Sequence, residues 1–129
     1  MDETKDKIEK YIEILRRQLN VELVIIFGSY LTERFSDESD IDILVAAVEF
    51  STMSKLEAYK ILSKPIWELK LNIDPIPVTV EEISDYPRAS FLSEVMSSGK
   101  VVYRKAAWYP FKKDGVQQGR VYLYYGGPK

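Results

Sequence analysis

Hydrophobic positions recur with helical spacing near the start of the chain and then run on as strand-like segments. Residues 3–19 carry apolar side chains at the i, i+3, i+4, i+7 positions of one helix face: Ile8, Tyr11, Ile12, Leu15 and Leu19. This spacing predicts an amphipathic helix with a solvated charged face. The apolar run at 21–27 predicts a strand that ends at Gly28, and the run at 41–48 predicts a second strand, buried on both faces apart from Asp42.

A second helical pattern covers residues 52–71 and contains a proline in its interior. Because proline removes a hydrogen-bond donor and clashes with the preceding turn, Pro65 should kink this helix or divide it into two. Trp67 within the segment and Trp108 beyond it are assigned to packing. Tyr30 and the C-terminal tyrosines could stack on a base or ribose, but single aromatic side chains more often belong to a core.

The next strand is expected over residues 71–80. Pro75 and Pro77 each remove a ladder donor, so this strand should lie at an edge of the sheet or be interrupted. Thr79 is the expected N-cap of a following helix. A last helix is expected over 88–98, and the apolar residues just after it predict a short closing strand.

Composition narrows the chemistry that this chain can perform. Its 129 residues predict one domain, and 46% hydrophobic residues are enough for a packed core. Cysteine and histidine are both absent, which excludes disulfides, thiolate or histidine-dependent catalytic triads and histidine-ligated zinc. The net charge of −2 disfavours strong sequence-independent binding to nucleic acid. The absence of an apolar run of about 18 residues argues against a membrane span, and a cytoplasmic location is expected.

The chemistry is concentrated where the first predicted strand ends and the second begins. Gly28-Ser29 is followed by ten residues and then by Asp40-Ile41-Asp42. A Gly-Ser turn offers backbone N–H groups and a hydroxyl to phosphate oxygens. The two aspartates lie on the same side of a strand, because side chains alternate with period two. Clustered carboxylates suit Mg²⁺, which shares its oxygen ligands with substrate phosphates, so the motif indicates chemistry on a nucleoside triphosphate.

With this motif the chain resembles the DNA polymerase β-like nucleotidyltransferases over residues 8–104, and within them the minimal nucleotidyltransferases that pair with HEPN-type proteins in toxin–antitoxin systems. The resemblance implies the small nucleotidyltransferase fold of α/β (α+β) class, with a mixed β-sheet of three to five strands packed against helices. It also implies a third carboxylate from a later strand, and Asp74 occupies that place. The alternative for Asp74 is an Asp-Pro turn.

The resemblance implies roles for these residues. Asp40, Asp42 and Asp74 would be catalytic and would hold two Mg²⁺ ions, because three carboxylates in one pocket repel one another without a cation. ATP or another nucleoside triphosphate would be the substrate, with Gly28 and Ser29 as phosphate contacts. Asp74 would help to ligate the second metal or accept the proton of the attacking hydroxyl.

The sequence departs from the family just after the motif. Related minimal domains commonly carry Ala-Arg-Gly where this chain has Leu31-Thr32-Glu33. Arg34 is the candidate replacement for the missing arginine as a phosphate contact, and the alternative is an ordinary surface charge. The departure concerns triphosphate binding and leaves the expected fold unchanged.

The resemblance also predicts how the chain divides into segments and which functions it could have. Residues 1–104 form the minimal nucleotidyltransferase domain, and residues 105–129 form a C-terminal extension, a β-hairpin or arm that could support docking or a homo-oligomer. The favoured function is transfer of AMP from ATP to a hydroxyl of a HEPN-type partner protein, as an antitoxin. The alternatives are a non-catalytic antitoxin that neutralises its partner by complex formation and a small-molecule nucleotidyltransferase.

Overall fold

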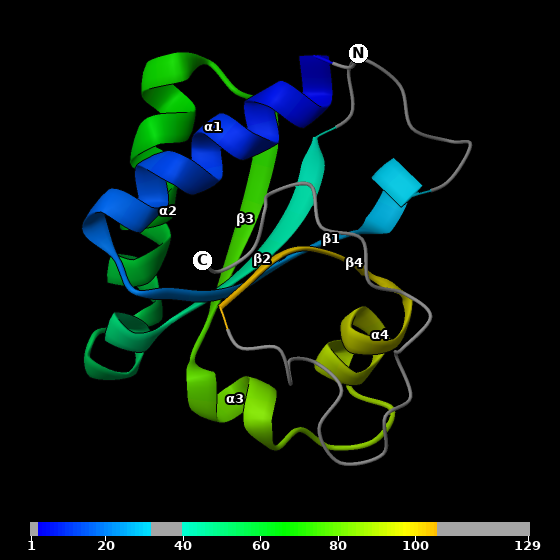
Figure 1. Ribbon diagram of the computed structural model, residues 1–129. Coiled ribbons are helices and arrows are strands. Elements are labelled where there is room, and N and C mark those ends of the chain that lie inside the picture. Colours follow the sequence, from blue (N-terminus) through cyan, green and yellow to red (C-terminus); the bar gives the residue numbers. More distant parts are fainter. Residues whose placement is uncertain (1–2, 32–39, 106–129) are drawn as a thin grey trace.

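The computed structural model describes residues 3–31 and 40–105. Within these residues four strands form one sheet in the order β3-β2-β1-β4. β1 (Val21–Phe27) is antiparallel to β2 (Ile41–Ala47) and to β4 (Lys100–Arg104), whereas β2 is parallel to β3 (Ile73–Val78). Helices cover both faces of the sheet (Figure 1). The expected α/β (α+β) class with a mixed sheet of three to five strands is therefore confirmed.

One face of the sheet is covered by α1 (Glu3–Gln18) and α2 (Lys55–Leu69). The apolar residues of α1 that share the helical spacing are fully buried, as that spacing predicts: Ile8, Tyr11, Ile12 and Leu15. The Tyr11 hydroxyl donates a hydrogen bond of 2.7 Å to the Leu62 carbonyl oxygen. This bond satisfies a buried polar group and ties the two helices together.

The opposite face carries a smaller core under α3 (Val80–Ser84) and α4 (Phe91–Ser98). Leu23 and Ile25 of β1 and Leu44 of β2 point into it, because successive side chains of a strand alternate between the faces. In Figure 1, α3 and α4 lie on the side of the sheet opposite α1 and α2. This second face also carries the candidate site described below.

Pro65 does not divide the second helical segment: α2 continues through it as one helix. The helix begins at a capping box in which the Ser54 side chain accepts from the Glu57 backbone N–H and the Glu57 side chain accepts from the Ser54 N–H. Pro65 itself is buried within the helix. The assignment of Trp67 to packing is wrong, since this residue is 81% exposed.

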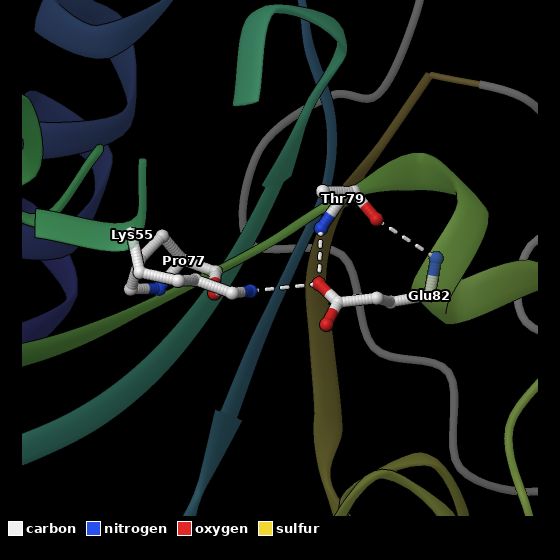
Figure 2. Close-up of polar contacts among 4 residues, drawn as sticks. All are labelled: Lys55, Pro77, Thr79 and Glu82. Atoms are coloured by element: carbon white, nitrogen blue, oxygen red, sulfur yellow. Dashed lines mark hydrogen bonds and ion pairs between the residues drawn. The ribbon is translucent and has the colours of Figure 1, made fainter. Parts of the chain in front are cut away.

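β3 is an edge strand, as its prolines predict. It leads into α3, whose N-cap is Thr79; the Thr79 hydroxyl accepts from the Glu82 N–H, and the Glu82 carboxylate accepts from the Thr79 N–H. Figure 2 shows that Lys55 Nζ reaches across from α2 to the Pro77 carbonyl oxygen at 3.1 Å and to Glu82 at 2.8 Å. One lysine therefore joins α2, the end of β3 and the start of α3.

The last helix and the last strand of the described residues are those that the sequence predicts, but their boundaries differ. α4 begins at Phe91, later than the expected residue 88, because Ser90 is its N-cap and accepts from the Ser93 N–H. β4 follows directly and occupies the other edge of the sheet. In the part of the chain that the structure describes, no helix is both long enough and apolar enough to cross a membrane.

Candidate active site

Phe27, Asp42 and Asp74 lie side by side in a row across the sheet, at the C-terminal end of β1. Asp42 of β2 is the register partner of Phe27 in β1 and of Asp74 in β3. All three share a strand face with residues of the smaller core, so their side chains project toward the face covered by α3 and α4. Asp40 immediately precedes β2. The fold thus brings Asp42 and Asp74 together, although 32 positions separate them in the sequence (74 − 42).

Asp42 lies in an environment that disfavours its charge. Partial burial raises the pKa of Asp42, and the negative charges of Asp74 and then Asp40 raise it further. A carboxylate surrounded in this way is stabilised by a cation or by hydrogen-bond donors from a ligand. The electrostatics of the row therefore suit a positively charged group at Asp42.

Gly28 is the residue at the turn that follows β1, and its backbone requires glycine for two reasons. Its φ of 80° lies in the left-handed region that side-chain-bearing residues rarely adopt. A Cβ atom at this position would also collide with Oδ2 of Asp42. The turn and the carboxylate are thus in direct contact.

The structure describes only some of the other residues that the sequence analysis singled out. The backbone of Ser29 belongs to the short 3₁₀ helix η1 (Gly28–Leu31), which directly follows β1. Tyr30 is half-buried and packs against the α1/α2 core, which favours packing over stacking on a ligand. Arg34 and Trp108 lie outside the described residues, and so does most of the predicted extension.

The acidic residues of this region are candidate ligands for a divalent metal ion. Among residues 3–31 and 40–105, no three acidic side chains lie close enough together to form a complete metal site. The donor set still fits Mg²⁺, because this ion keeps several waters and is commonly held by one or two carboxylates together with substrate phosphates. Asp42 and Asp74, adjacent on parallel strands and mutually repulsive, provide two such carboxylates.

Two hollows open beside this row. The first, called here the Gly28 cavity, has a volume of about 420 Å³ and is lined by Phe27, Gly28, Leu31, Phe91, Glu94, Val95 and Ser98. The second, called here the Asp74 groove, has a volume of about 660 Å³ and is lined by β3 from Asp74 to Val78 together with Lys55, Leu56, Tyr59, Glu82, Phe91 and Leu92. One hollow therefore adjoins the glycine turn and the other adjoins the edge carboxylate.

Phe91, the first residue of α4, lines both hollows. Its ring packs edge-to-face against Phe27, with centroids 5.5 Å apart and an interplanar angle of 79°. It nevertheless remains 52% exposed. Sequence reasoning missed this residue, because an isolated phenylalanine at a helix start looks like any other core position.

Known proteins resemble this chain in sequence. A family model described as polymerase beta, nucleotidyltransferase, matches residues 9–107. Two proteins of Methanocaldococcus jannaschii, both named "Putative protein adenylyltransferase", are 38% identical over 56 residues and 41% identical over 49 residues. These matches cover 43% and 38% of this chain and 57% and 50% of the relatives. The chain thus spans about half the length of the curated relatives it matches.

A solved structure agrees with the family match at the level of the fold. It is a protein of Sulfolobus solfataricus described as a "putative nucleotidyltransferase", with a TM-score of 0.58 and 22% sequence identity. The superposition covers 79% of this chain and 85% of the other. At this identity the likeness concerns how the chain folds.

Proposed function

This chain belongs to the polymerase β nucleotidyltransferase family, and from that premise we propose that it transfers a nucleoside monophosphate, AMP from ATP, to a hydroxyl group of a partner protein. The observation that carries the proposal is the row in which Asp42 lies between the Gly28 turn and Asp74. The relatives named as protein adenylyltransferases support AMP as the transferred group and a protein as the acceptor.

The Gly28-Ser29 turn and the three candidate carboxylates have distinct roles in this proposal. Backbone N–H groups at Gly28 and Ser29 bind phosphate oxygens, and Arg34 adds a charged contact. Asp40, Asp42 and Asp74 would hold Mg²⁺ together with the nucleotide phosphates, with two ions expected in the complete complex. When bound, the metal would offset the negative charge on the phosphates and favour the alkoxide form of the acceptor. The raised pKa of Asp42 supports this assignment, because a cation would relieve the repulsion that causes it.

The order of the residues across the sheet supports an in-line displacement. The acceptor hydroxyl oxygen forms a bond to the α-phosphorus, and the bond from that phosphorus to the bridging oxygen breaks. The bonding electrons leave with pyrophosphate. Gly28 and Asp74 flank Asp42 on opposite sides, so the leaving group can lie toward the glycine turn while the acceptor approaches from the β3 edge. Asp74 accepts the hydroxyl proton as the new bond forms, or it would help to hold the metal while the proton passes to solvent water.

The Asp74 groove is the side from which the acceptor would approach. Leu56 and Tyr59 of α2 expose apolar surface along it. β3 forms the sheet edge here, and Pro75 and Pro77 lack N–H donors, so the groove favours side-chain contacts over strand addition. We propose that the occupant is a hydroxyl-bearing segment of a HEPN-type partner, whose modification would make this chain an antitoxin. Within the chain, residues 1–104 would be the transferase domain and residues 105–129 an extension that aids docking.

A specific feature favours a second function. Leu31-Thr32-Glu33 replaces the Ala-Arg-Gly of related minimal domains, which removes an arginine from the expected phosphate contacts. A chain weakened in this way could neutralise its partner by complex formation alone. The two functions differ in whether neutralisation of the partner requires the carboxylates of Asp40 and Asp42.

Label transfer separates the two functions. The chain is mixed with ATP labelled at the α-phosphate and with the HEPN-type partner, and the Asp40→Asn/Asp42→Asn double variant is the comparison. Transfer by the wild type that is lost in a folded double variant supports catalysis. If the double variant still neutralises the partner in cells, complex formation is sufficient for protection.

A further inference from the structure

We infer that the Gly28 cavity binds the base of the nucleotide, a purine stacked on the ring of Phe91. This inference rests on the proposed function, because it concerns the same substrate. It assigns residues to the recognition of the base, which neither the motif nor the family match addresses. The proposed function gives roles to Gly28, Asp40, Asp42 and Asp74 in binding the phosphates and the metal. It gives none to the α4 residues that line the cavity: Phe91, Glu94, Val95 and Ser98.

The position of the cavity fits a nucleoside. Its wall includes Gly28, whose backbone is the proposed phosphate contact and which lies against Asp42. A nucleotide with its phosphates at this turn therefore has its sugar and base within reach of the cavity. The volume of about 420 Å³ lies within the usual range for small-molecule sites. The Asp74 groove, which Phe91 also lines, is a separate hollow and stays open to the acceptor.

The walls of the cavity suit an aromatic ring. Phe27, Leu31 and Val95 contribute apolar surface. Phe91 is held by its edge-to-face contact with Phe27, yet about half of it is exposed. An aromatic side chain that a neighbour already fixes loses little entropy when a base stacks on it. A purine offers a larger ring surface to such a platform than a pyrimidine does.

The polar residues of the cavity provide a means of reading the base. Glu94 and Ser98 lie one helical turn apart on α4 and both line the cavity. The Ser98 hydroxyl donates a 2.8 Å hydrogen bond to the Glu94 backbone carbonyl oxygen, which orients that side chain along the turn. A glutamate carboxylate accepts hydrogen bonds and donates none, so it favours a base that presents an amino group. Adenine has such a group, whereas hypoxanthine has a carbonyl in its place.

The first test measures the affinity of ATP with Mg²⁺ by calorimetry for the wild type, Phe91→Ala, Phe91→Tyr and Trp67→Ala. Phe91→Ala should bind about ten-fold more weakly, the usual effect of removing one stacking partner. Phe91→Tyr should retain the wild-type affinity because it keeps the ring. Trp67→Ala is the matched control: it removes an aromatic residue that is 81% exposed on α2 and lines neither hollow.

The outcomes distinguish this inference from the function on which it rests. Equal affinity of the wild type and a folded Phe91→Ala variant overturns the base site but leaves the transferase proposal standing. Failure of the wild type to bind ATP overturns both. Circular dichroism and thermal unfolding establish whether each variant is folded, and Phe91→Leu, which keeps an apolar side chain without a ring, replaces Phe91→Ala if the latter does not fold.

The second test compares ATP with inosine triphosphate. The wild type should prefer ATP by about ten-fold, the effect expected for a hydrogen bond to a charged group. In Glu94→Ala this preference should disappear, because the acceptor is removed. An unchanged preference in a folded Glu94→Ala variant would overturn the assignment of Glu94.

Discussion

Asp42 and Asp74 are register partners on neighbouring parallel strands, with both carboxylates on the same face of the sheet. Like charges in directly paired positions destabilise a sheet. The unfavourable effect is visible at Asp42, whose pKa is raised by burial and by the charges of Asp74 and Asp40. Such an arrangement is explained if the site normally contains a cation, since a binding site is selected for its ligand and not for the stability of the free protein.

The first prediction follows from this raised pKa. The folded protein holds the Asp42 proton to a higher pH than the unfolded chain does, so the contribution of this group to stability falls as pH rises from its ordinary pKa of 3.8 through the folded value. Asp42→Asn cannot ionise and avoids this loss. Without metal, the variant should therefore melt at a higher temperature than the wild type at neutral pH.

Thermal unfolding between about pH 4 and pH 7 at low salt measures this effect. Asp6→Asn is the control, because Asp6 is exposed on α1, which covers the opposite face of the sheet. Saturating Mg²⁺ with ATP should raise the melting temperature of the wild type and not that of Asp42→Asn. A variant that melts below the wild type at neutral pH would contradict the view that Asp42 is held at a cost to stability.

Gly28→Ala tests the contact between the turn and the carboxylate. The positive φ of Gly28 and the collision of a Cβ with Asp42 should together lower the free energy of unfolding by roughly 1–3 kcal/mol. Denaturant unfolding measures the loss. Adding Asp42→Ala should recover the steric part of it and leave the backbone part, so strictly additive effects of the two substitutions would show that the residues do not touch.

The lysine link between α2 and α3 should matter for stability and not for nucleotide binding. Burial raises the pKa of Glu82, but hydrogen bonds from Lys55 and Thr79 and the charge of Lys55 outweigh it, so the net pKa lies below the ordinary value. The stabilisation from this group is therefore present at neutral pH and is lost as pH falls through the folded pKa. Thr79→Ala should cost about 1 kcal/mol as a lost helix cap.

Lys55→Met should cost less, roughly 0.2–1 kcal/mol, because Lys55 and Glu82 are both well exposed. High salt should reduce the effect of Lys55→Met while leaving that of Thr79→Ala largely unchanged. Urea unfolding at two salt concentrations distinguishes these responses. If Lys55→Met were the costlier substitution, the ion pair and not the cap would hold this connection.

Truncation after Lys105 tests the proposed division of the chain. Lys105 is tied to β1, since its N–H donates to the Glu22 carbonyl oxygen at 2.9 Å. The shortened protein should remain folded and bind nucleotide, and should associate more weakly with itself or with its partner. Light scattering and calorimetry measure these properties. An insoluble product would show that residues 106–129 are part of the domain core.

Local patterns in the sequence predicted most of the elements but not how their surfaces are used. The spacing in α1, the edge position of β3 and the Thr79 cap depend on nearby residues and were predicted correctly. The exposure of Trp67 was not, because helical periodicity does not show which apolar residues of α2 find a partner in the core. The two hollows around Phe91 depend on how α4 packs on β1, which is a nonlocal property.

The candidate site likewise combines a local motif, which can be recognised in the sequence, with a nonlocal pairing, which cannot. The spacing from Gly28-Ser29 to Asp40 and Asp42 lies within one short segment, so it can be recognised in the sequence. Asp74 had to be supplied by resemblance, because its pairing with Asp42 depends on the register of two strands joined by α2. Repulsion among the three carboxylates was expected from the resemblance, whereas its location at Asp42 depends on the strand register that pairs Asp42 with Asp74.

Titration of the wild type with ATP in the presence of Mg²⁺, beside Asp42→Asn and the Asp6→Asn control, tests the central assignment most directly. Asp42→Asn should bind ATP much more weakly than the wild type when Mg²⁺ is present, and the difference should shrink when the metal is removed by chelation. Asp6→Asn should match the wild type in both conditions. Equal affinities of the wild type and a folded Asp42→Asn variant with Mg²⁺ present would contradict the placement of the metal–nucleotide site at Asp42.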